Sequence, residues 1–527
     1  MKKFLISLLL LVAMVFNIVA MTSCGDTSEN YDDYRDKIAD EGYLIPEGGY
    51  DGSEVTITFY HTMSADKLQP ILDKHIKRFN EQYPNIHIDH KQIGGYNEVV
   101  DQIRTEITAG NQPNIAYCYP DHVAVYNKAR AAVPLNNLIA STIEMTDAQG
   151  NKTFLGLTDE QKADFVDVYY NEGKVYDKRG TMYTMPLSKS TEALYYNKTF
   201  FEVCQRIYIE DYELDMQGNY VLDAEGNKKP NPNKGNDIYN ISVPKTWDDM
   251  EAVCRKIKAI DPSAIPLGYD SESNWFITMC EQAGSDYTSL DSKNHFTFNN
   301  KTNHAFVERF AGWFKEGLVT TQELFGAYTS DLFKVVAAGE QKCYMVIGST
   351  GGASYQEPPK DSNGVHYFET GLASIPQLNP DEPKAISQGP ALCIFKDENP
   401  QEVVASWLFV KFLTTDAQFQ AEFSMKSGYA TVTKSARELS LYKSWLDSAN
   451  GQGKITASAV KHTMENEGSY YISHAFVGSS DARLQVGLII QNVFAVAKGG
   501  ASASELKATI EAEFKKAVSA CKYAIGQ

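Results

Sequence analysis

Short strand-like segments alternate with amphipathic helical segments along this sequence, and this alternation restricts the fold more than any other feature. Residues 55–60 alternate between polar and apolar side chains, as a half-buried strand does. A helical apolar spacing follows at 68–79, then a strand at 86–90, a helix at 96–109 and a strand at 114–119. Strands that alternate with helices form βαβ units on a parallel sheet. The sequence therefore predicts the α/β class.

The same alternation returns after residue 190. We expect further elements there, at residues 193–196, 247–260, 344–347, 370–374 and 392–395. The chain has 527 residues, more than one hydrophobic core normally supports, so two or more domains are expected. A polar insertion at 205–243 contains a predicted hairpin around Gly226 and Asn227. We interpret it as decoration, because the spacing of an EF-hand calcium loop is absent.

The N-terminal segment predicts export and lipid anchoring. Lys2 and Lys3 precede an apolar run from Phe4 to Met21, which is typical of a secretory signal peptide at residues 1–23. The run approaches the length of a membrane span, so an uncleaved anchor is the alternative. Met21 to Cys24 resembles the lipobox of bacterial lipoproteins, which implies a diacylglyceryl group on Cys24. We expect residues 24–52 to be a lipidated tether that holds the chain outside the cytoplasm, on the outer face of the cell membrane.

Composition and motifs narrow the function classes. The formal net charge of −18 argues against nucleic acid, whose binding depends on Lys and Arg. Seven scattered cysteines beyond Cys24, with no CxxC pair, indicate neither a disulfide framework nor a zinc site. The nucleophile-elbow, zincin, P-loop and dinucleotide-binding motifs are missing. We expect no enzyme, no cofactor and no metal. Tyr195 and Tyr196 could suggest paired iron-binding tyrosinates, but packing on a strand is the favoured interpretation.

Six segments in a shared order resemble family 1 extracellular solute-binding proteins of bacterial ABC importers. The closest pattern is that of the members that bind glycerol-3-phosphate. The segments are Phe59–Met63, Arg78–Asn85, Ala109–Ile115, Ser190–Lys198, Pro244–Trp247 and Ser427–Lys434. The resemblance implies a type 2 periplasmic-binding-protein-like fold, with a βα-built sheet flanked by helices in each of two lobes and a cleft between them. We expect lobe 1 at 53–186 and 366–424, and lobe 2 at 187–365 and 425–527.

The resemblance also implies a set of ligand-binding residues. Tyr96, Ser190 and Tyr429 match pocket residues of the family, and Ser349 and Thr350 follow a predicted strand, where free backbone N–H groups can face a ligand. The full set of expected ligand-binding residues is Tyr96, Asp121, Ser190, Trp275, Ser349, Thr350, Gly389, Tyr429 and Arg483. Trp275 is expected to stack on the ligand, and Arg483 lies near an arginine that grips phosphate in the relative.

One departure from the family pattern affects the expected ligand. Pro120 stands where the glycerol-3-phosphate binders have a glutamate, with Asp121 next to it. A mono- or oligosaccharide is therefore the first hypothesis, and a sugar phosphate, glycerol-3-phosphate or related phosphodiester is the alternative. We expect a monomer that works with ABC permease subunits. A surface carbohydrate-active enzyme and a sensor accessory are the other classes considered.

Overall fold

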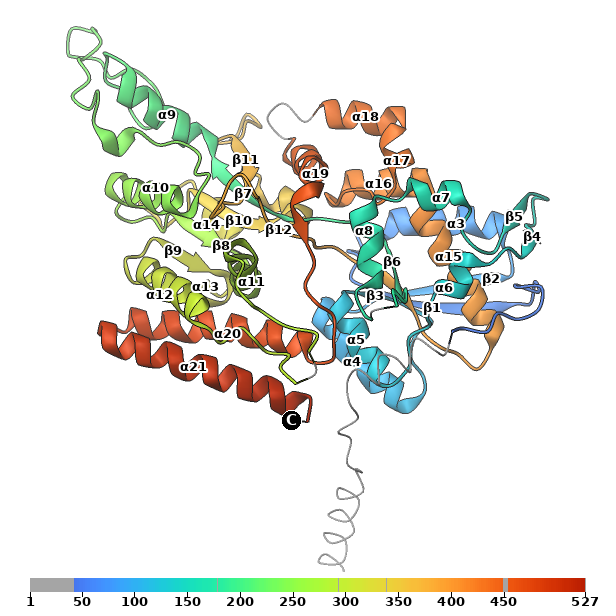
Figure 1. Ribbon diagram of the computed structural model, residues 1–527. Coiled ribbons are helices and arrows are strands. Elements are labelled where there is room, and N and C mark those ends of the chain that lie inside the picture. The colour runs from blue at the N-terminus through green and yellow to red at the C-terminus, as the bar shows by residue number, and fades with distance from the viewer. Residues whose placement is uncertain (1–41, 178, 292, 338, 449–453, 527) are drawn as a thin grey trace, which may run out of the picture.

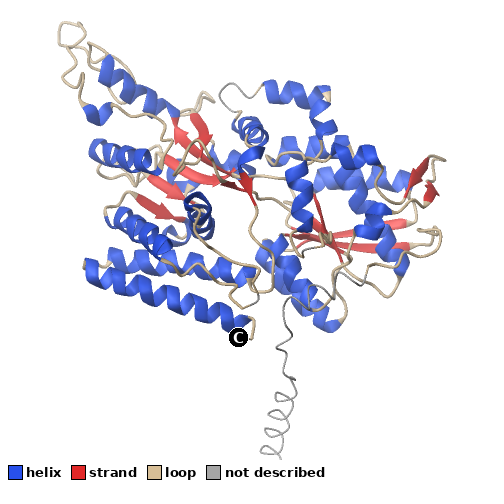
Figure 2. Cartoon of the chain, viewed as in Figure 1, coloured by secondary structure: helices blue, strands red, loops and turns tan. Residues whose placement is uncertain are grey.

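The computed structural model describes residues 42–177, 179–291, 293–337, 339–448 and 454–526. Within these residues, two five-stranded mixed sheets form the centres of two lobes, and helices surround each sheet (Figures 1 and 2). The predicted two-lobed α/β fold is confirmed. The expected signal peptide and the lipidation site Cys24 lie outside the described residues.

The sheet of lobe 1 has the strand order β2–β1–β3–β13–β6. β1 is parallel to β2 and β3, whereas β13 is antiparallel to β3 and β6. The expected parallel βαβ arrangement therefore holds only for the first three strands, because β13 enters the sheet from a much later part of the chain. The strands are β1 (Val55–His61), β2 (Ile86–Gln92), β3 (Ile115–Cys118), β6 (Thr184–Pro186) and β13 (Ala391–Ile394).

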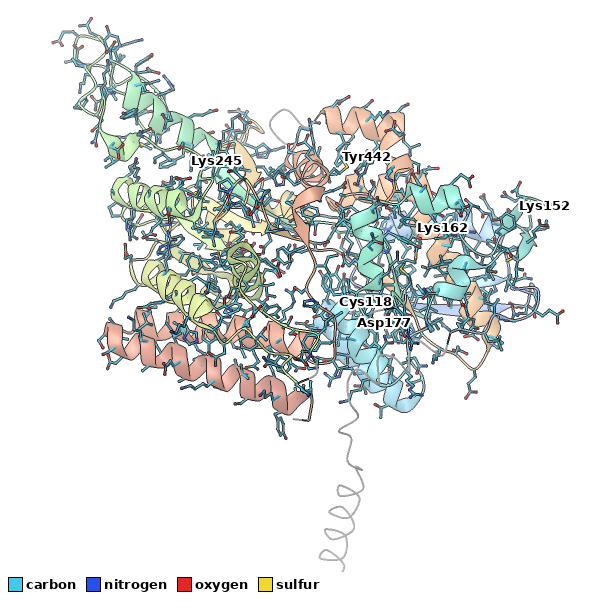
Figure 3. The ribbon with its side chains drawn as sticks, in the orientation of Figure 1. Cys118, Lys152, Lys162, Asp177, Lys245 and Tyr442 are labelled. Atoms are coloured by element: carbon cyan, nitrogen blue, oxygen red, sulfur yellow. The ribbon has the colours of Figure 1, made fainter. Side chains whose placement is uncertain are left out.

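Both faces of this sheet are buried. Phe59 lies in the core beneath α3 and α15, whereas the next residue, Tyr60, lies in the core beneath α4 and α5. Successive strand side chains point to opposite faces, so one strand serves both cores. Cys118, also in the second core, lies in the interior of the lobe, whereas Lys152 lies at its outer edge (Figure 3). The covering helices are α3 (Gln69–Gln82), α4 (Tyr96–Ala109), α5 (Pro120–Lys128) and α15 (Pro400–Thr415).

Smaller elements complete lobe 1. The β4–β5 hairpin is antiparallel and lies at the periphery. These elements are α6 (Asn136–Ala140), β4 (Glu144–Thr146), β5 (Lys152–Phe154), α7 (Asp159–Asp164), α8 (Asp167–Asn171), η1 (Glu172–Lys174) and α16 (Ala417–Ser427).

The sheet of lobe 2 has the order β11–β7–β10–β8–β9, with β8 parallel to its two neighbours and β7 antiparallel to β10 and β11. The expected return of the chain to lobe 1 at residue 366 is wrong. β11 bonds to β7 at the edge of this sheet, so the chain leaves lobe 2 only after Ser374. The strands are β7 (Glu192–Asn197), β8 (Leu267–Tyr269), β9 (Val319–Thr321), β10 (Met345–Ser349) and β11 (Thr370–Ser374).

Lobe 2 has a large aromatic core that contains Trp247, Trp275 and Trp313. The last two long helices, α20 and α21, lie side by side along one edge of the lobe (Figure 1). Among the described residues, no helix combines the length and the apolar composition that crossing a bilayer requires. The main helices are α9 (Lys198–Ile209), α10 (Trp247–Ile260), α11 (Glu272–Ala283), α12 (Lys301–Lys315), α19 (Ile455–Glu465), α20 (Ser479–Lys498) and α21 (Ala503–Ala524).

Short elements connect these helices. The hairpin predicted in the insertion is confirmed by a bridge between Leu222 and Lys228, and the insertion projects from lobe 2 beyond α9 (Figure 1). The short elements are η2 (Asp237–Tyr239), α13 (Gln322–Phe325), α14 (Ser330–Phe333), η3 (Thr350–Gln356) and η4 (Glu467–Ser469). α17 (Lys434–Glu438) and α18 (Ser440–Asp447) pack instead against α16 of lobe 1.

Three segments run side by side between the lobes, and we call them the hinge: residues 187–191, 385–390 and 470–475. The first leads from the sheet of lobe 1 to that of lobe 2, and the second leads back. β12 (Ala385–Ile386) pairs in parallel with β14 (Tyr470–Tyr471), which joins the second segment to the third. Ser190 pairs with Gln388, which joins the first segment to the second.

A buried lysine fastens the β4–β5 region to α15. The Lys411 ammonium donates to the carbonyl oxygens of Phe154, at 2.5 Å, and Gly156, at 2.7 Å. It forms no ion pair with any described carboxylate, and burial lowers its pKa to about 8. The charged form is therefore held inside the lobe by carbonyl dipoles alone, which makes it sensitive to pH.

We predict that Lys411 makes stability rise with pH above about 8. Between that pH and ~10.4 the unfolded lysine keeps its proton while the folded one has lost it, so the free energy of unfolding increases by up to ~1.4 kcal/mol per pH unit. Urea unfolding near pH 8 and pH 9.5, compared between the native chain and Lys411→Met, measures this slope. Equal slopes in the two proteins would contradict the prediction.

Candidate functional site

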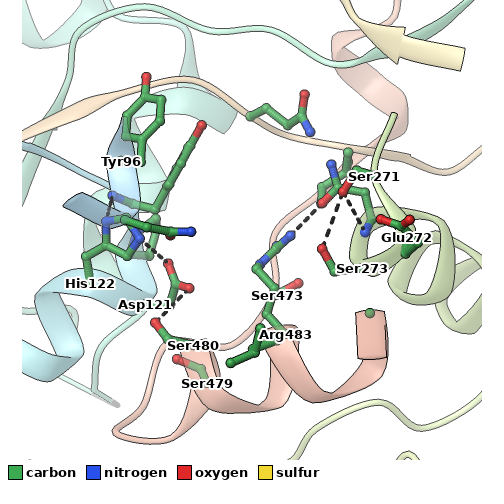
Figure 4. A pocket seen from close by; sticks show the side chains of 18 of the residues that line it. Tyr96, Asp121, His122, Ser271, Glu272, Ser273, Ser473, Ser479, Ser480 and Arg483 are labelled. Atoms are coloured by element: carbon green, nitrogen blue, oxygen red, sulfur yellow. Dashed lines mark hydrogen bonds and ion pairs between the residues drawn. The ribbon is translucent and has the colours of Figure 1, made fainter. Parts of the chain in front are cut away.

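A cleft of about 450 Å³ lies between the lobes, beside the hinge (Figure 4). Its walls are the first turns of helices that directly follow strands: α4 after β2, α5 after β3 and α11 after β8. In α/β folds, ligands bind in the crevice outside the carboxyl ends of the strands. The topology therefore brings residues from distant parts of the chain to one place.

Tyrosine rings form the upper part of the lobe 1 wall. The ring centroids of Tyr96 and Tyr119 lie 4.5 Å apart, and Tyr96 is stacked on Tyr117 at 6.4 Å. Burial raises the pKa of all three tyrosines, so they stay neutral. The Tyr117 hydroxyl is buried without a hydrogen-bond partner. Tyr96 and Tyr119 line the cleft and offer apolar ring faces and hydroxyl groups to a ligand there.

An acidic residue lies lower on the same wall. The Ser480 hydroxyl, from α20 of lobe 2, donates to Asp121 Oδ2 at 3.0 Å, so this bond joins the two lobes across the cleft. Burial alone would raise the pKa of Asp121, but nearby His122, Arg483 and the Ser480 bond outweigh it and leave that pKa lowered. Asp121 is therefore an ionised acceptor that faces the cleft (Figure 4).

The lobe 2 wall combines the start of α11 with α20. Ser271 caps α11 by accepting from the backbone N–H of Asn274, at 3.2 Å. Arg483 donates to the side-chain oxygen of Asn274, and no described carboxylate lies within ion-pair distance of its guanidinium. Its other donors remain for a ligand, because a guanidinium carries five N–H groups.

The floor of the cleft belongs to the hinge and to η1. Glu172 lies there, and its Oε2 accepts from Lys189 Nζ at 2.6 Å and from the Ser387 hydroxyl at 3.1 Å. Glu172 and Lys189 are both buried. The Ser473 hydroxyl, from the third hinge segment, is buried without a partner and also lines the cleft. A ligand that reaches the floor can supply the missing hydrogen bond.

The residues expected to bind the ligand fall into two groups and one outlier. Tyr96, Asp121 and Arg483 line the cleft described above. The others are grouped at the hinge and the end of β10: the Ser349 hydroxyl donates to that of Ser190 at 3.3 Å. The remaining members of this second group are Thr350, Gly389 and Tyr429.

Most of the second group makes structural contacts. Thr350 is completely buried, where its hydroxyl accepts hydrogen bonds from the Thr191 backbone and the Thr463 side chain. Burial raises the pKa of Tyr429, and interaction with the Tyr96 hydroxyl partly offsets that rise. Tyr429 therefore extends the tyrosine cluster toward the hinge, whereas Thr350 supports the hinge from beneath.

Trp275 does not face the cleft, which corrects the expectation that it stacks on a ligand. Its side chain has no exposed surface and is stacked on Tyr269 at 4.8 Å, with Phe310 at 4.2 Å on the aromatic core. One residue earlier on the same helix turn, Asn274 lines the cleft. A shift of one residue rotates a helix by about 100°, enough to move a side chain from core to cleft.

Several cleft residues escaped the sequence analysis. Tyr119, Asn274 and the floor residues Glu172 and Ser473 belong to no motif considered there. Tyr119 could have been found, because it is the last residue of the strand predicted at 114–119, at the end where ligands bind. Glu172 and Ser473 could not, because only the packing of the hinge brings them to the cleft.

Nothing in the described part of the chain is arranged to hold a metal. There, no group of three or more His, Cys, Asp or Glu side chains could enclose an ion. The cysteines of this part are buried and free. The cleft itself offers hydrogen-bonding groups, tyrosine rings, the Arg483 guanidinium and several carboxylates.

Comparison with known proteins places these features in a family context. Residues 74–449 match the family model described as bacterial extracellular solute-binding protein. The sn-glycerol-3-phosphate-binding periplasmic protein UgpB of Escherichia coli K12 is 23% identical over 413 residues, which are 76% of this chain and 80% of that protein.

Solved structures of similar proteins agree in fold. A cyclic alpha-maltosyl-1,6-maltose binding protein from Arthrobacter globiformis has a TM-score of 0.59 at 17% identity, covering 88% of this chain and 99% of that one. An ABC substrate-binding protein from Listeria monocytogenes in complex with cycloalternan has 0.62 at 15%, covering 89% and 99%. UgpB from Mycobacterium tuberculosis in complex with glycerophosphocholine has 0.60 at 16%, covering 88% and 98%. At these identities the likeness shows the fold alone.

We predict that the hinge depends on Gly389. Its φ is +106°, and a Cβ there would lie 2.4 Å from the carbonyl oxygen of Ser188, so Gly389→Ala should lower the free energy of unfolding by about 1–3 kcal/mol. Gly352→Ala is the matched control, because a Cβ at Gly352 meets nothing closer than Tyr355 at 4.0 Å. Denaturant unfolding compares the two variants, and equal losses would refute this role.

Proposed function

This chain belongs to the bacterial extracellular solute-binding protein family, and from that premise we propose that its interlobe cleft captures a neutral saccharide. The loaded protein delivers this solute to the permease subunits of an ABC importer. The bound solute lies between the tyrosine cluster of lobe 1 and the α11–α20 wall of lobe 2. A transport receptor of two lobes closes around its ligand by hinge motion.

The charge balance of the cleft carries this proposal. Its lining has one guanidinium, on Arg483, against five carboxylates: Asp121, Glu172, Asp270, Glu272 and Glu323. Lys189 pairs with Glu172, so four carboxylates remain against the one guanidinium. Ionised carboxylates only accept hydrogen bonds, so they suit the hydroxyl donors of a sugar and repel a phosphate dianion. The faces of Tyr96 and Tyr119 suit the apolar C–H face of a sugar ring. Neighbours in fold include a cyclic alpha-maltosyl-1,6-maltose binding protein and a substrate-binding protein in complex with cycloalternan.

A phosphate-containing solute is the second candidate, and one observation favours it. The Arg483 guanidinium has no carboxylate partner among the described residues and can bind phosphate bidentately. UgpB of Escherichia coli is named for glycerol-3-phosphate, and UgpB of Mycobacterium tuberculosis is in complex with glycerophosphocholine. A phosphodiester carries a single negative charge, so it conflicts less with the acidic lining than glycerol-3-phosphate does.

We propose that the chain binds without catalysing a reaction. The relatives are named as binding proteins. The remaining features of this proposal come from the sequence: a monomer outside the cytoplasm, held to the membrane by lipid on Cys24.

Contacts between the lobes bracket the cleft and indicate how closure is held. Ser480 of lobe 2 donates to Asp121 of lobe 1 at 3.0 Å. Toward the tyrosine side, the Lys67 ammonium of lobe 1 lies 5.1 Å from the ring centre of Tyr355, on η3 of lobe 2. The cation–ring contact is worth about 0.5–1 kcal/mol and the hydrogen bond to the Asp121 carboxylate about 1.5–3 kcal/mol. A solute that binds both walls can therefore shift the balance between open and closed forms.

We predict that a neutral saccharide, tested with maltotriose and cycloalternan, raises the unfolding temperature and reduces the radius of gyration. Tyr96→Ala should weaken binding by about 1–3 kcal/mol through loss of a ring contact, with Tyr170→Ala, on α8 and outside the cleft lining, as control. Thermal-shift assays, calorimetry and small-angle scattering measure these effects. If glycerophosphocholine binds instead, with an affinity that falls in high salt and in Arg483→Gln, the second candidate replaces the first.

We also predict lipid anchoring. Expressed in a bacterium, the chain should incorporate radioactive palmitate and lose residues 1–23, because Cys24 then becomes the acylated N-terminus. Cys24→Ala should abolish the label, while Cys118→Ala, a buried cysteine, should keep it. Persistent labelling of Cys24→Ala would exclude this anchor.

A further inference from the structure

A buried acid lies directly behind the lobe 2 wall. Glu192, at the start of β7, is 2% exposed and accepts two hydrogen bonds. The Tyr269 hydroxyl donates to its Oε2 at 2.7 Å, and the Asn274 side-chain amide donates to its Oε1 at 3.2 Å. No described cation forms an ion pair with it. Burying a carboxylate with only neutral partners is costly, so this arrangement calls for a reason beyond packing.

The hydrogen bonds around Asn274 have a required direction. An ionised carboxylate can only accept, so the NH₂ end of the Asn274 amide must face Glu192. The oxygen end then faces Arg483, whose guanidinium can only donate. A reversed amide would set its NH₂ against the guanidinium and its oxygen against the carboxylate. Glu192 therefore determines which end of Asn274 meets Arg483.

We propose that Glu192 is a positioning residue that holds Arg483 at the wall of the cleft through the Asn274 amide. Glu192 itself does not line the cleft and touches no solute. This inference rests on the proposed function in one respect: it assumes that the lobe 2 wall, which contains Arg483, binds the solute. The chain Tyr269–Glu192–Asn274–Arg483 links β8, β7, α11 and α20, so it also keeps these elements in register at the cleft.

The arrangement makes the position of Arg483 depend on pH. Glu192 faces titratable groups from each packed element: Tyr269 of β8, Asp270 after it, Arg483 of α20 and Tyr471 of β14. Burial raises the pKa of Glu192 to about 7, although the Tyr269 and Asn274 bonds and the Arg483 charge lower it in part. Burial also raises the pKa of Tyr269 and Tyr471, so they stay neutral.

An ionised carboxylate can only accept hydrogen bonds, and this decides at which pH Arg483 is held more firmly. Above about pH 7 Glu192 is ionised, the amide is oriented and Arg483 is held. Below it the protonated carboxyl carries a donor of its own, so it no longer requires the NH₂ end of Asn274. Only Arg483 then still requires one orientation of the Asn274 amide, so the amide and the guanidinium that it accepts from are held less firmly.

A test without any solute measures how tightly Arg483 is held. p-Hydroxyphenylglyoxal modifies arginines, and mass spectrometry gives the rate at Arg483 relative to Arg104, whose side chain is 61% exposed. In the native chain this relative rate should rise about tenfold from pH 8 to pH 6. Glu192→Gln, which cannot ionise, should remove the pH dependence, and Asn274→Leu should give the high rate at both pH values.

Two outcomes would overturn the proposal. One is a native rate ratio that does not change with pH; the other is a Glu192→Gln variant that keeps the native pH dependence. The native comparison needs no variant, so it stands even if a substitution prevents folding. Calorimetry with maltotriose and glycerophosphocholine completes the test. If the relative rate follows pH but neither probe binds, the positioning role stands and the proposed function fails.

Discussion

The buried ion pair between Glu172 and Lys189 is the interaction on which the cleft depends. Its Nζ–Oε2 distance is 2.6 Å, and its two side chains are almost completely buried. Glu172 belongs to lobe 1, Lys189 to the first hinge segment, and Ser387, which donates to the same oxygen, to the second. Removing one partner of such a pair leaves a buried charge without a partner, which typically lowers the free energy of unfolding by about 3–5 kcal/mol. One carboxylate thus joins the first two hinge segments and forms part of the cleft floor.

The two lobes supply different binding groups to the cleft. Lobe 1 supplies neutral tyrosine rings and the ionised Asp121, and lobe 2 supplies Arg483 and the start of α11. Neither wall is a complete site, because each offers partners to only one side of a ligand. The Asp121–Ser480 bond shows that the walls come within direct contact at one end. Under the proposed function, solute binding and closure of the cleft are therefore coupled.

Polar groups buried behind the cleft wall influence how the residues that line the cleft are oriented. Glu192 does not line the cleft. Its carboxylate only accepts hydrogen bonds, so it orients the Asn274 amide and, through that amide, the Arg483 guanidinium in the cleft wall. The stacked rings of Trp275 and Tyr269 lie on the same side and keep α11 against the core. A change in this layer alters the cleft without touching its surface.

The sequence by itself determined the α/β class, most strands and the order of the elements, because alternation of polar and apolar residues is a local property. Three of the residues that it singled out through the family resemblance, Tyr96, Asp121 and Arg483, line the cleft. The sequence could not decide that β11 stays in lobe 2, that Trp275 is core and Asn274 cleft, or that Glu172 and Ser473 form the floor. Strand pairing, helix rotation and the packing of hinge segments depend on contacts between residues far apart in the chain. Only the tertiary structure makes those contacts, so only it decided them.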